Sequence, residues 1–177
     1  MNFKNTANDK GFSLVELLIV VVIIGILAAI AIPNLLASRR SANEGSAVSD
    51  LRMVHGAQMT YASSLGKGLF AGNAGTVDVA PFTQLGANGI IDNQLAGGLK
   101  SGYVFTGGKV DTTVDWPSSF CLRAVPVSGS GAFATGIRNI AVATDGVMYG
   151  GLASDVNNAQ CTVATGSISV TSATPLS

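Results

Sequence analysis

The chain has 177 residues with ten basic and ten acidic side chains, so its formal net charge at neutral pH is zero. This balance argues against a protein that binds nucleic acid through bulk electrostatic attraction. Hydrophobic residues make up 47% of the sequence and charged residues 11%, whereas an ordinary soluble domain carries roughly 25% charged residues. So apolar a composition excludes a disordered chain. It indicates one domain, or one domain with an appended segment that avoids water or faces a protein lattice.

The apolar residues are concentrated near the N-terminus. The 22 residues between Glu16 and Arg39 carry no charge. A helix that crosses a bilayer needs about 20 predominantly apolar residues, and residues 12–37 form a 26-residue segment with Glu16 as its one charged side chain. The leader before it, residues 1–11, carries two lysines and one aspartate. Positive charge on that side predicts that the leader stays in the cytoplasm and that the rest of the chain is exported.

A helical pattern continues beyond the apolar segment. Pro33 ends the purely aliphatic run, but the residues that follow recur every three or four positions and are predicted to share one face. They are Ala47, Leu51, Val54, Gln58, Tyr61 and Leu65. Arg39, Arg40, Glu44, Asp50 and Arg52 are predicted to occupy the other faces. Residues 38–65 are therefore expected to form an amphipathic half of the same helix.

Gly66, Lys67 and Gly68 supply a glycine-rich stop of the kind that ends helices. The expected helix runs from Phe12 to Leu65, 54 residues, and would be about 80 Å long at 1.5 Å per residue. A helix of that length cannot be buried inside a domain of this size.

The rest of the chain indicates a connecting loop followed by a small antiparallel sheet. Residues 66–100 are rich in Gly, Ala and Asn and are expected to have little regular structure beyond short helical turns near 81–85 and 90–95. In residues 101–177, four segments are typical of strands, 103–105, 120–127, 137–144 and 147–149. Asp145–Gly146 predicts a tight turn between the last two. The Ser- and Thr-rich tail is expected to hold a final strand near 168–170 or to be a loose end.

Two cysteines, Cys121 and Cys161, lie 40 residues apart in the part that would be exported. In an oxidising compartment one such pair indicates a disulfide, which stabilises by about 2–4 kcal/mol. A metal site is a poor alternative, because the single His55 and a widely separated cysteine pair do not have the close spacing of zinc ligands. We expect no metal and no cofactor, and His55 is expected to pack in the core or at its rim.

The residues around Glu16 are the most informative. An acidic side chain near the start of an apolar helix is costly in a membrane, by roughly 2.5–3.5 kcal/mol at its centre. If the chain is cut after Gly11, the new ammonium group of Phe12 and the Glu16 carboxylate lie four residues apart in every subunit. In a bundle of parallel helices, the ammonium of one chain would meet the carboxylate of the next. Such pairing would select the register, because an unpaired buried charge is strongly disfavoured.

The sequence Gly11-Phe12-Ser13-Leu14-Val15-Glu16, with Lys10 before it and the aliphatic run with Pro33 after it, resembles the class III signal of type IV prepilins and the related pseudopilins. The resemblance implies an α+β pilin fold, with a long N-terminal helix packed on a small C-terminal antiparallel sheet. It implies that a prepilin peptidase cuts between Gly11 and Phe12 and methylates the Phe12 amino group. Glu16 would guide assembly.

The same resemblance implies that Gly25 and Pro33 bracket a part of the helix that loses regular hydrogen bonding in the filament, where a proline already removes one donor. Cys121 and Cys161 would close a C-terminal disulfide loop. The partners implied are other copies of the chain in a helical homopolymer, the peptidase, the assembly machinery of the inner membrane, and the membrane itself before assembly.

Two simpler interpretations stay open. Gly11 and Phe12 would otherwise mark an uncleaved signal anchor, with Glu16 reaching the membrane interface. Alternatively, Ala29-Ile30-Ala31 fits the small-residue rule of an ordinary signal peptide, which would release a soluble domain starting at Ile32. Glu16 inside the hydrophobic region argues against that second interpretation.

The function indicated is a structural subunit of a type IV pilus, a surface filament for adhesion, motility or DNA uptake, with a pseudopilin of a type II secretion or competence system as the alternative. A third possibility is a pilus-borne adhesin that binds DNA or a surface, with Arg123 and Arg138 in a basic patch, although balanced charges support nucleic-acid binding weakly. No nucleophile elbow or phosphate-binding loop indicates an enzyme. The expected location is the inner membrane for the precursor and the cell surface for the filament.

Overall fold

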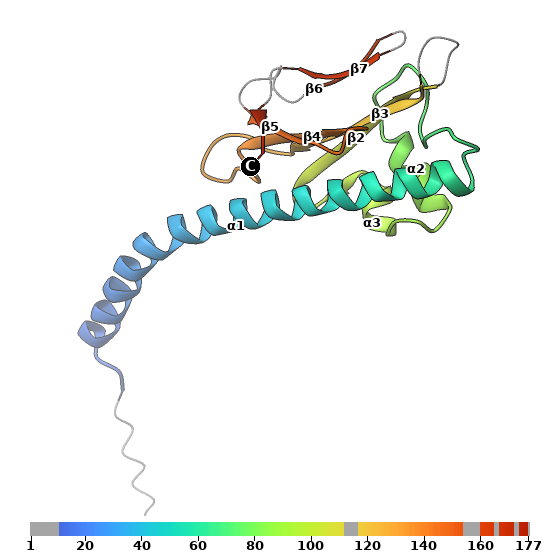
Figure 1. Ribbon diagram of the computed structural model, residues 1–177. Helices are drawn as coiled ribbons and strands as arrows, with labels where there is room; N and C mark the ends of the chain where they lie inside the picture. Colours follow the sequence, from blue (N-terminus) through green and yellow to red (C-terminus); the bar gives the residue numbers. More distant parts are fainter. Residues whose placement is uncertain (1–10, 112–116, 154–159, 165–166, 172–173, 177) are drawn as a thin grey trace, which may run out of the picture. The chain divides into compact units, whose positions relative to one another are not determined.

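The structure of the chain is a computed structural model that describes residues 11–111, 117–153, 160–164, 167–171 and 174–176 (Figure 1). The predicted leader, residues 1–11, therefore lies outside the described residues except for Gly11. The chain divides into two compact units, residues 1–37 and 38–177. Helix α1, Leu14–Ser64, supplies the described helical part of the first unit and continues into the second.

Helix α1 has 51 residues, close to the 54 expected, and contains Pro33 in its interior. The prediction that the helix continues past this proline is confirmed. At its end, the backbone N–H groups of Leu65 and Gly66 both donate to the carbonyl of Tyr61, at 2.9 and 2.8 Å. Lys67 and Gly68 then take positive φ angles of 50° and 91°, and the Gly68 N–H donates to the Ala62 carbonyl at 2.9 Å, as in the caps that end helices. The predicted glycine stop is confirmed.

The amphipathic half of α1 packs on the sheet of the second unit as the periodicity predicts. Ala47, Leu51, Val54 and Gln58 are fully buried, since they lie three or four residues apart on one face. Leu65, expected on this face, is 53% exposed because it lies beyond the helix end.

Glu44 and Asp50 correct the expectation that the charged residues of α1 lie on other faces. They are only 8% and 4% exposed. Both carboxylates are buried because each has a partner from the head, the part of the second unit that follows α1 (residues 65–177). A paired charge tolerates burial that an unpaired one does not.

The main sheet has six strands in the order β1-β2-β3-β4-β5-β8, and every neighbouring pair is antiparallel. The strands are β1 Leu99–Lys100, β2 Tyr103–Val110, β3 Ser119–Pro126, β4 Arg138–Ala143, β5 Met148–Leu152 and β8 Thr174–Pro175. The predicted four-stranded meander corresponds to β2 to β5. The turn at Asp145–Gly146 is confirmed, with Gly146 at φ 75° and its N–H donating to Ala143.

A two-stranded hairpin, β6 Gln160–Ala164 and β7 Ser167–Thr171, forms a second sheet. It contacts β2, β3 and β4 and lies on the opposite side of the main sheet from α1 (Figure 1). The expected disulfide between Cys121 and Cys161 is present and joins β3 to β6. The tail therefore contains a hairpin, so the alternative of a loose end is wrong for these residues.

The segment between α1 and the sheet is more regular than expected. It contains α2 Ala80–Ala87 and α3 Asn93–Ala96 where helical turns were predicted. Phe82, Leu85 and Leu95 from this segment are fully buried in the core between α1 and the sheet. The fold is α+β, a long N-terminal helix packed with a small antiparallel sheet, and this prediction is confirmed.

Candidate assembly site

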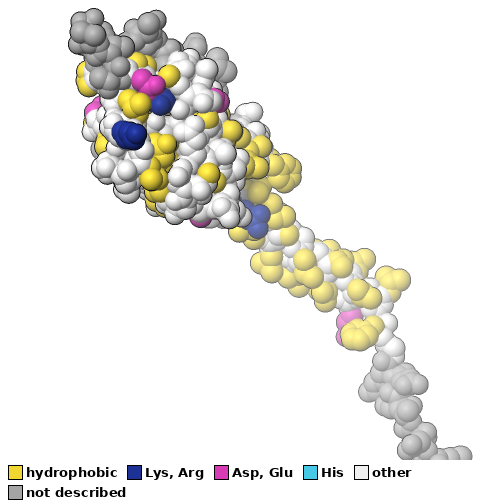
Figure 2. All heavy atoms as spheres, turned by 90° about the vertical axis from the view of Figure 1, so that its right-hand side faces the viewer, with side chains coloured by type: hydrophobic (Ala, Val, Ile, Leu, Met, Phe, Trp, Pro, Cys, Tyr) yellow, Lys and Arg dark blue, Asp and Glu magenta, His cyan; other side chains and the backbone are white. Residues whose placement is uncertain are grey.

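The N-terminal part of α1 carries apolar side chains that nothing in the described chain covers. From Phe12 to Leu35, sixteen large apolar side chains are each at least 51% exposed. Figure 2 shows hydrophobic groups over this part of the helix on the face in view. By length and composition, α1 is able to cross a membrane, and the apolar window has a mean hydropathy of 3.2 with none of its residues buried.

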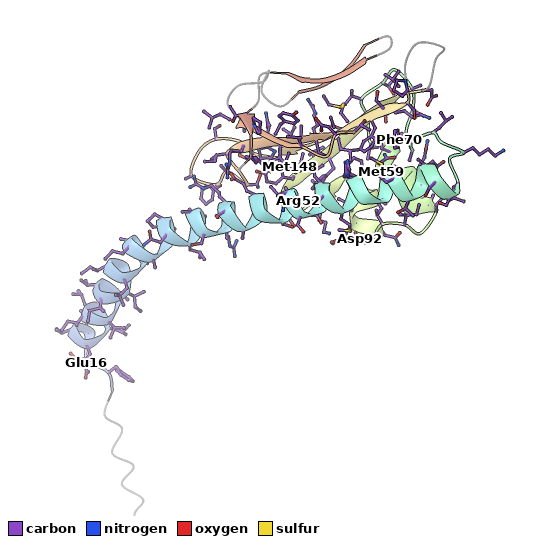
Figure 3. The ribbon with its side chains drawn as sticks, viewed as in Figure 1. Glu16, Arg52, Met59, Phe70, Asp92 and Met148 are labelled. Carbon is purple, nitrogen blue, oxygen red and sulfur yellow. A yellow bond between two sulfur atoms is a disulfide. The ribbon has the colours of Figure 1, made fainter. Side chains whose placement is uncertain are left out.

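Ser13 and Glu16 form a reciprocal cap at the start of α1. The Ser13 N–H donates to Glu16 Oε2 at 3.2 Å, and the Val15 N–H donates to Ser13 Oγ at 3.3 Å. Two of the backbone donors at a helix start, which have no partner within the helix, are thereby satisfied. The Glu16 carboxylate also lies at the positive end of the helix dipole, where negative charge is favoured. Figure 3 labels Glu16 at this end of the ribbon.

This cap is a feature that the sequence interpretation missed. The spacing Ser-x-x-Glu directly before an apolar run is the sequence signature of a capping box, and it was present in residues 13–16. The geometry gives Glu16 an intramolecular role in the single chain. One carboxylate oxygen, Oε2, accepts from Ser13, and Oε1 accepts no hydrogen bond from the described residues.

The other predicted assembly residues are placed as follows. Gly11 and Phe12 precede the helix, and the Phe12 side chain is 87% exposed. Gly25 and Pro33 lie inside the continuous helix α1. A Cβ atom at Gly25 would meet no atom within 4 Å, so packing within this chain does not require glycine there. The predicted loss of helical hydrogen bonding concerns the filament and stays a prediction.

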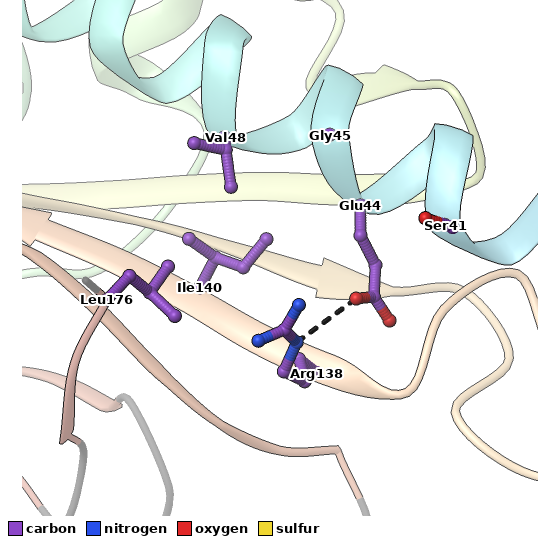
Figure 4. A pocket seen from close by; sticks show the side chains of 7 residues that line it. All are labelled: Ser41, Glu44, Gly45, Val48, Arg138, Ile140 and Leu176. Carbon is purple, nitrogen blue, oxygen red and sulfur yellow. Dashed lines mark hydrogen bonds and ion pairs between the residues drawn. The ribbon is translucent and has the colours of Figure 1, made fainter.

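A second group of polar contacts holds the amphipathic half of α1 on the head. Glu44 accepts from the Ile137 N–H at 2.8 Å and from Arg138 Nε at 3.1 Å (Figure 4). Asn43, its neighbour on the helix, donates from Nδ2 to the Thr135 carbonyl at 2.9 Å. Because these bonds join residues more than 90 positions apart, they fix where the loop before β4 meets the helix.

Lys100 makes the corresponding contact on β1. Its ammonium lies 2.9 Å from Asp50 Oδ1 on α1 and 3.1 Å from Asp92 Oδ2 at the start of α3. The hydrogen bond with Asp50 raises the pKa of Lys100. The Leu95 N–H, followed by the Lys100 ammonium, holds the pKa of Asp92 below its ordinary value. The connecting segment is thus tied to the helix by one cation and two carboxylates.

His55 and the two arginines of the suggested basic patch have local partners. The His55 ring lies 5.4 Å from the Phe120 ring, centroid to centroid, and its Nε2 is 3.4 Å from the Thr144 carbonyl. This is packing at the rim of the core, as expected. Arg123 donates to Thr106 Oγ1 at 3.1 Å, and Arg138 pairs with Glu44.

Comparisons with known proteins agree with this arrangement. The family described as the prokaryotic N-terminal methylation motif matches residues 6–32. The chain is 68% identical over 37 residues to the type IV wide pilus major component PilA4 of Thermus thermophilus, which is 21% of this chain and 28% of that protein. It is 40% identical over 73 residues to the type IV major pilin protein PilA of Myxococcus xanthus, 41% of this chain and 32% of that one.

A third relative is the type II secretion system core protein G of Escherichia coli, 39% identical over 56 residues, 32% of this chain and 39% of that protein. The chain therefore spans about a third of the length of these relatives. No solved structure matches the chain significantly. An exposed apolar N-terminal helix with a capped glutamate, continuing into an α+β head, defines a pilin-like protein. Over its N-terminal part, the chain carries the methylation motif and is similar to type IV pilins and to the pseudopilin of a type II secretion system.

Proposed function

We propose that this chain is the structural subunit of a type IV pilus. A prepilin peptidase cuts the precursor between Gly11 and Phe12 and methylates the new amino group of Phe12. The mature subunit waits in the inner membrane and then enters a helical surface filament of identical chains. The chain has no catalytic role in this assembly, and separate inner-membrane machinery supplies the energy.

The observation that carries the proposal is the uncovered apolar half of α1. Burying a large apolar side chain completely is worth about 1.5–3 kcal/mol, so sixteen of them amount to at most roughly 24–48 kcal/mol. This exceeds the whole stability of a typical domain, about 5–15 kcal/mol. The helix therefore needs an apolar environment throughout its life. A bilayer supplies it before assembly and a bundle of neighbouring helices supplies it afterwards.

Glu16 supports the assembly step. A carboxylate in an apolar bundle is disfavoured unless it is paired, and among the described residues of the single chain Glu16 accepts a hydrogen bond only from the Ser13 N–H. The amino group that cleavage creates at Phe12 is the cation that a neighbouring copy brings. Pairing the Phe12 ammonium of one subunit with the Glu16 carboxylate of the next leaves neither charge unpaired and favours one axial register of the helices.

A pseudopilin of a type II secretion system is the second candidate. The match to the core protein G of Escherichia coli favours it, because that match extends over 56 residues of this chain. The match to a major pilin extends further, over 73 residues, and the most identical of these relatives is a pilus component. These two findings favour the pilus over the pseudopilus.

The test is the intact mass and N-terminal sequence of the protein sheared from the surface of native cells. The expected product starts at methylated Phe12 and is abundant in the sheared fraction. A chain that starts at Phe12 but stays in the cell envelope would favour the pseudopilin. A chain that starts at Ile32 or at Met1 would contradict prepilin processing and restore the signal peptide or the uncleaved anchor.

A further inference from the structure

An exposed aromatic side chain lies on a loop that is held in place by hydrogen bonds. Phe133, between β3 and β4, is 81% exposed, although the next residue, Ala134, is buried. The Thr135 N–H donates to the Ser128 carbonyl at 2.8 Å, and the Ser128 N–H donates to Thr135 Oγ1 at 3.2 Å. The loop is thus closed at its base while its tip presents a phenylalanine that buries little against the described chain.

Further exposed apolar side chains accompany Phe133 at this end of the sheet. Val127 and Ile137 lie at the two ends of the same loop and are 59% and 45% exposed. Leu152, 58% exposed, pairs with Arg138 in the sheet, directly after Ile137. Single exposed apolar residues are ordinary, but a group at one end of a domain marks an interaction surface.

Two arginines lie at the same end of the second unit. Arg39 lies four residues before Asn43, and Arg40 lies four residues before Glu44. The two residues of each such pair therefore share a face of α1. Asn43 and Glu44 are the residues that hold the loop, through Thr135 and Ile137. The loop therefore lies along the helical turn that follows the two arginines. We call Arg39, Arg40, Val127, Phe133, Ile137 and Leu152 the loop surface.

The loop surface has positive charge available. In the described ranges, the ion pairs are those of Lys100, Lys109 and Arg138, so neither Arg39 nor Arg40 has an acidic partner there. Arg40 Nε is buried and has no hydrogen-bond partner among the same residues. The Glu44 carboxylate, four residues after Arg40, already accepts from Ile137 and Arg138. A partner of this surface is thus apolar in part and negatively charged in part.

We propose that the loop surface docks on the anionic phospholipid headgroups of the membrane that holds the subunit before assembly. The apolar segment of α1 ends at Ala37, so Arg39 and Arg40 leave the hydrocarbon layer where the lipid phosphates begin. Arginine side chains at such a position extend to the phosphates, and an adjacent phenylalanine enters the boundary between headgroups and acyl chains. This inference rests on the proposed function, because it requires a membrane-held precursor.

The experiment uses the full chain in nanodiscs of phosphatidylethanolamine and phosphatidylglycerol, with lipids brominated near the top of the acyl chains as quenchers. Trp116→Phe removes the native tryptophan, and Phe133→Trp places the fluorescent group in the loop surface. The matched control is Leu65→Trp in the same background, since Leu65 is also exposed, at 53%. It lies 26 residues after Arg39, about 39 Å along the helical rise.

The expected result is that brominated lipid lowers the emission of the Phe133→Trp variant about twofold and leaves the Leu65→Trp variant within about 10%. Arg39→Gln with Arg40→Gln, or phosphatidylcholine in place of the anionic lipid, should return at least half of the lost emission. Equal quenching of both variants, or none in either, would overturn the inference. A blue shift of the Phe133→Trp variant only in assembled filaments would overturn it in favour of a second copy.

Two further readouts separate the possible failures. Co-elution of the chain with the nanodiscs reports whether α1 enters the membrane, so its absence contradicts the proposed function, whereas co-elution without quenching contradicts only the docking of the loop surface. Hydrogen exchange of the unmodified chain covers the case in which a tryptophan variant fails to fold. Amides of residues 127–137 should exchange more slowly in anionic nanodiscs than in neutral ones, and equal rates would contradict the inference.

Discussion

Glu44 should be the charged residue on which the attachment of α1 to the head depends most. It is 8% exposed and accepts two hydrogen bonds, from Ile137 and Arg138. A hydrogen bond to a charged group contributes about 1.5–3 kcal/mol. The Arg138 contribution is smaller than this, roughly 0–1 kcal/mol, because that side chain is 50% exposed and solvent screens the pair. Glu44→Ala should therefore lower the free energy of unfolding by about 2–3 kcal/mol.

For a head of this size, that loss corresponds to a fall in melting temperature of about 6–10 °C. Glu44→Gln keeps an acceptor for the Ile137 N–H and loses only the charge, so its fall should be roughly half as large. The assay is scanning calorimetry of the full chain in detergent micelles, which keep the apolar helix covered. Arg52→Ala is the matched control, since Arg52 is exposed on the same helix and forms no ion pair within the described residues.

The result that would refute this reasoning is a Glu44→Ala variant that melts within about 2 °C of the wild type, inside the range of ordinary surface substitutions. Such a result would mean that the apolar face of α1 alone holds the helix on the sheet. A Glu44→Gln variant as unstable as Glu44→Ala would instead show that the charge, and so the arginine, carries the interaction.

Three other outcomes are expected. Glu16→Ala should keep the fold and the membrane binding of the subunit but abolish filaments in a shearing assay, and a normal filament yield would contradict pairing between subunits. Gln58 is fully buried, donates to the Ala71 carbonyl at 3.1 Å and accepts from the Ala71 N–H at 2.8 Å. Gln58→Ala should therefore lower the free energy of unfolding, measured by chemical denaturation, by about 2–4 kcal/mol. A loss under about 1 kcal/mol would contradict this. Because the pKa of Asp92 is lowered from 3.8 in the folded chain, its stabilisation is present above that value and is lost as pH falls through the folded pKa. The melting temperature should therefore drop below about pH 4, and Asp92→Asn should drop less over that range.

The residues that the sequence misplaced share one physical cause. Glu44 and Asp50 were predicted to lie on helix faces other than the apolar one, and a carboxylate is rarely buried. The two carboxylates can be buried because Arg138 and Lys100, which are distant in the sequence, form ion pairs with them. Periodicity within a helix reports hydrophobicity along one element and carries no information about a charge that another element supplies.

Strand β2 shows the same limit in the sheet. The predicted strand ended at Phe105, before Gly107 and Gly108, and glycine inside a strand weakens it. In the structure β2 continues to Val110. A Cβ at Gly107 would lie 2.6 Å from Leu122 Cδ2 and 2.8 Å from the Cys121 carbonyl. Glycine is there because neighbouring β3 approaches closely, and that requirement appears only after the strands pair.

The sequence by itself determined the properties that depend on neighbours along the chain. These are the continuous apolar helix, its capped start at Ser13 and Glu16, its stop after Ser64, and the turn at Asp145–Gly146, all of which depend on residues a few positions apart. Tertiary structure alone decided which carboxylates are buried, how the connecting segment enters the core, and which apolar side chains, such as Phe133, stay uncovered. Those outcomes depend on contacts between residues tens of positions apart, whose free energy exists only once the chain has folded.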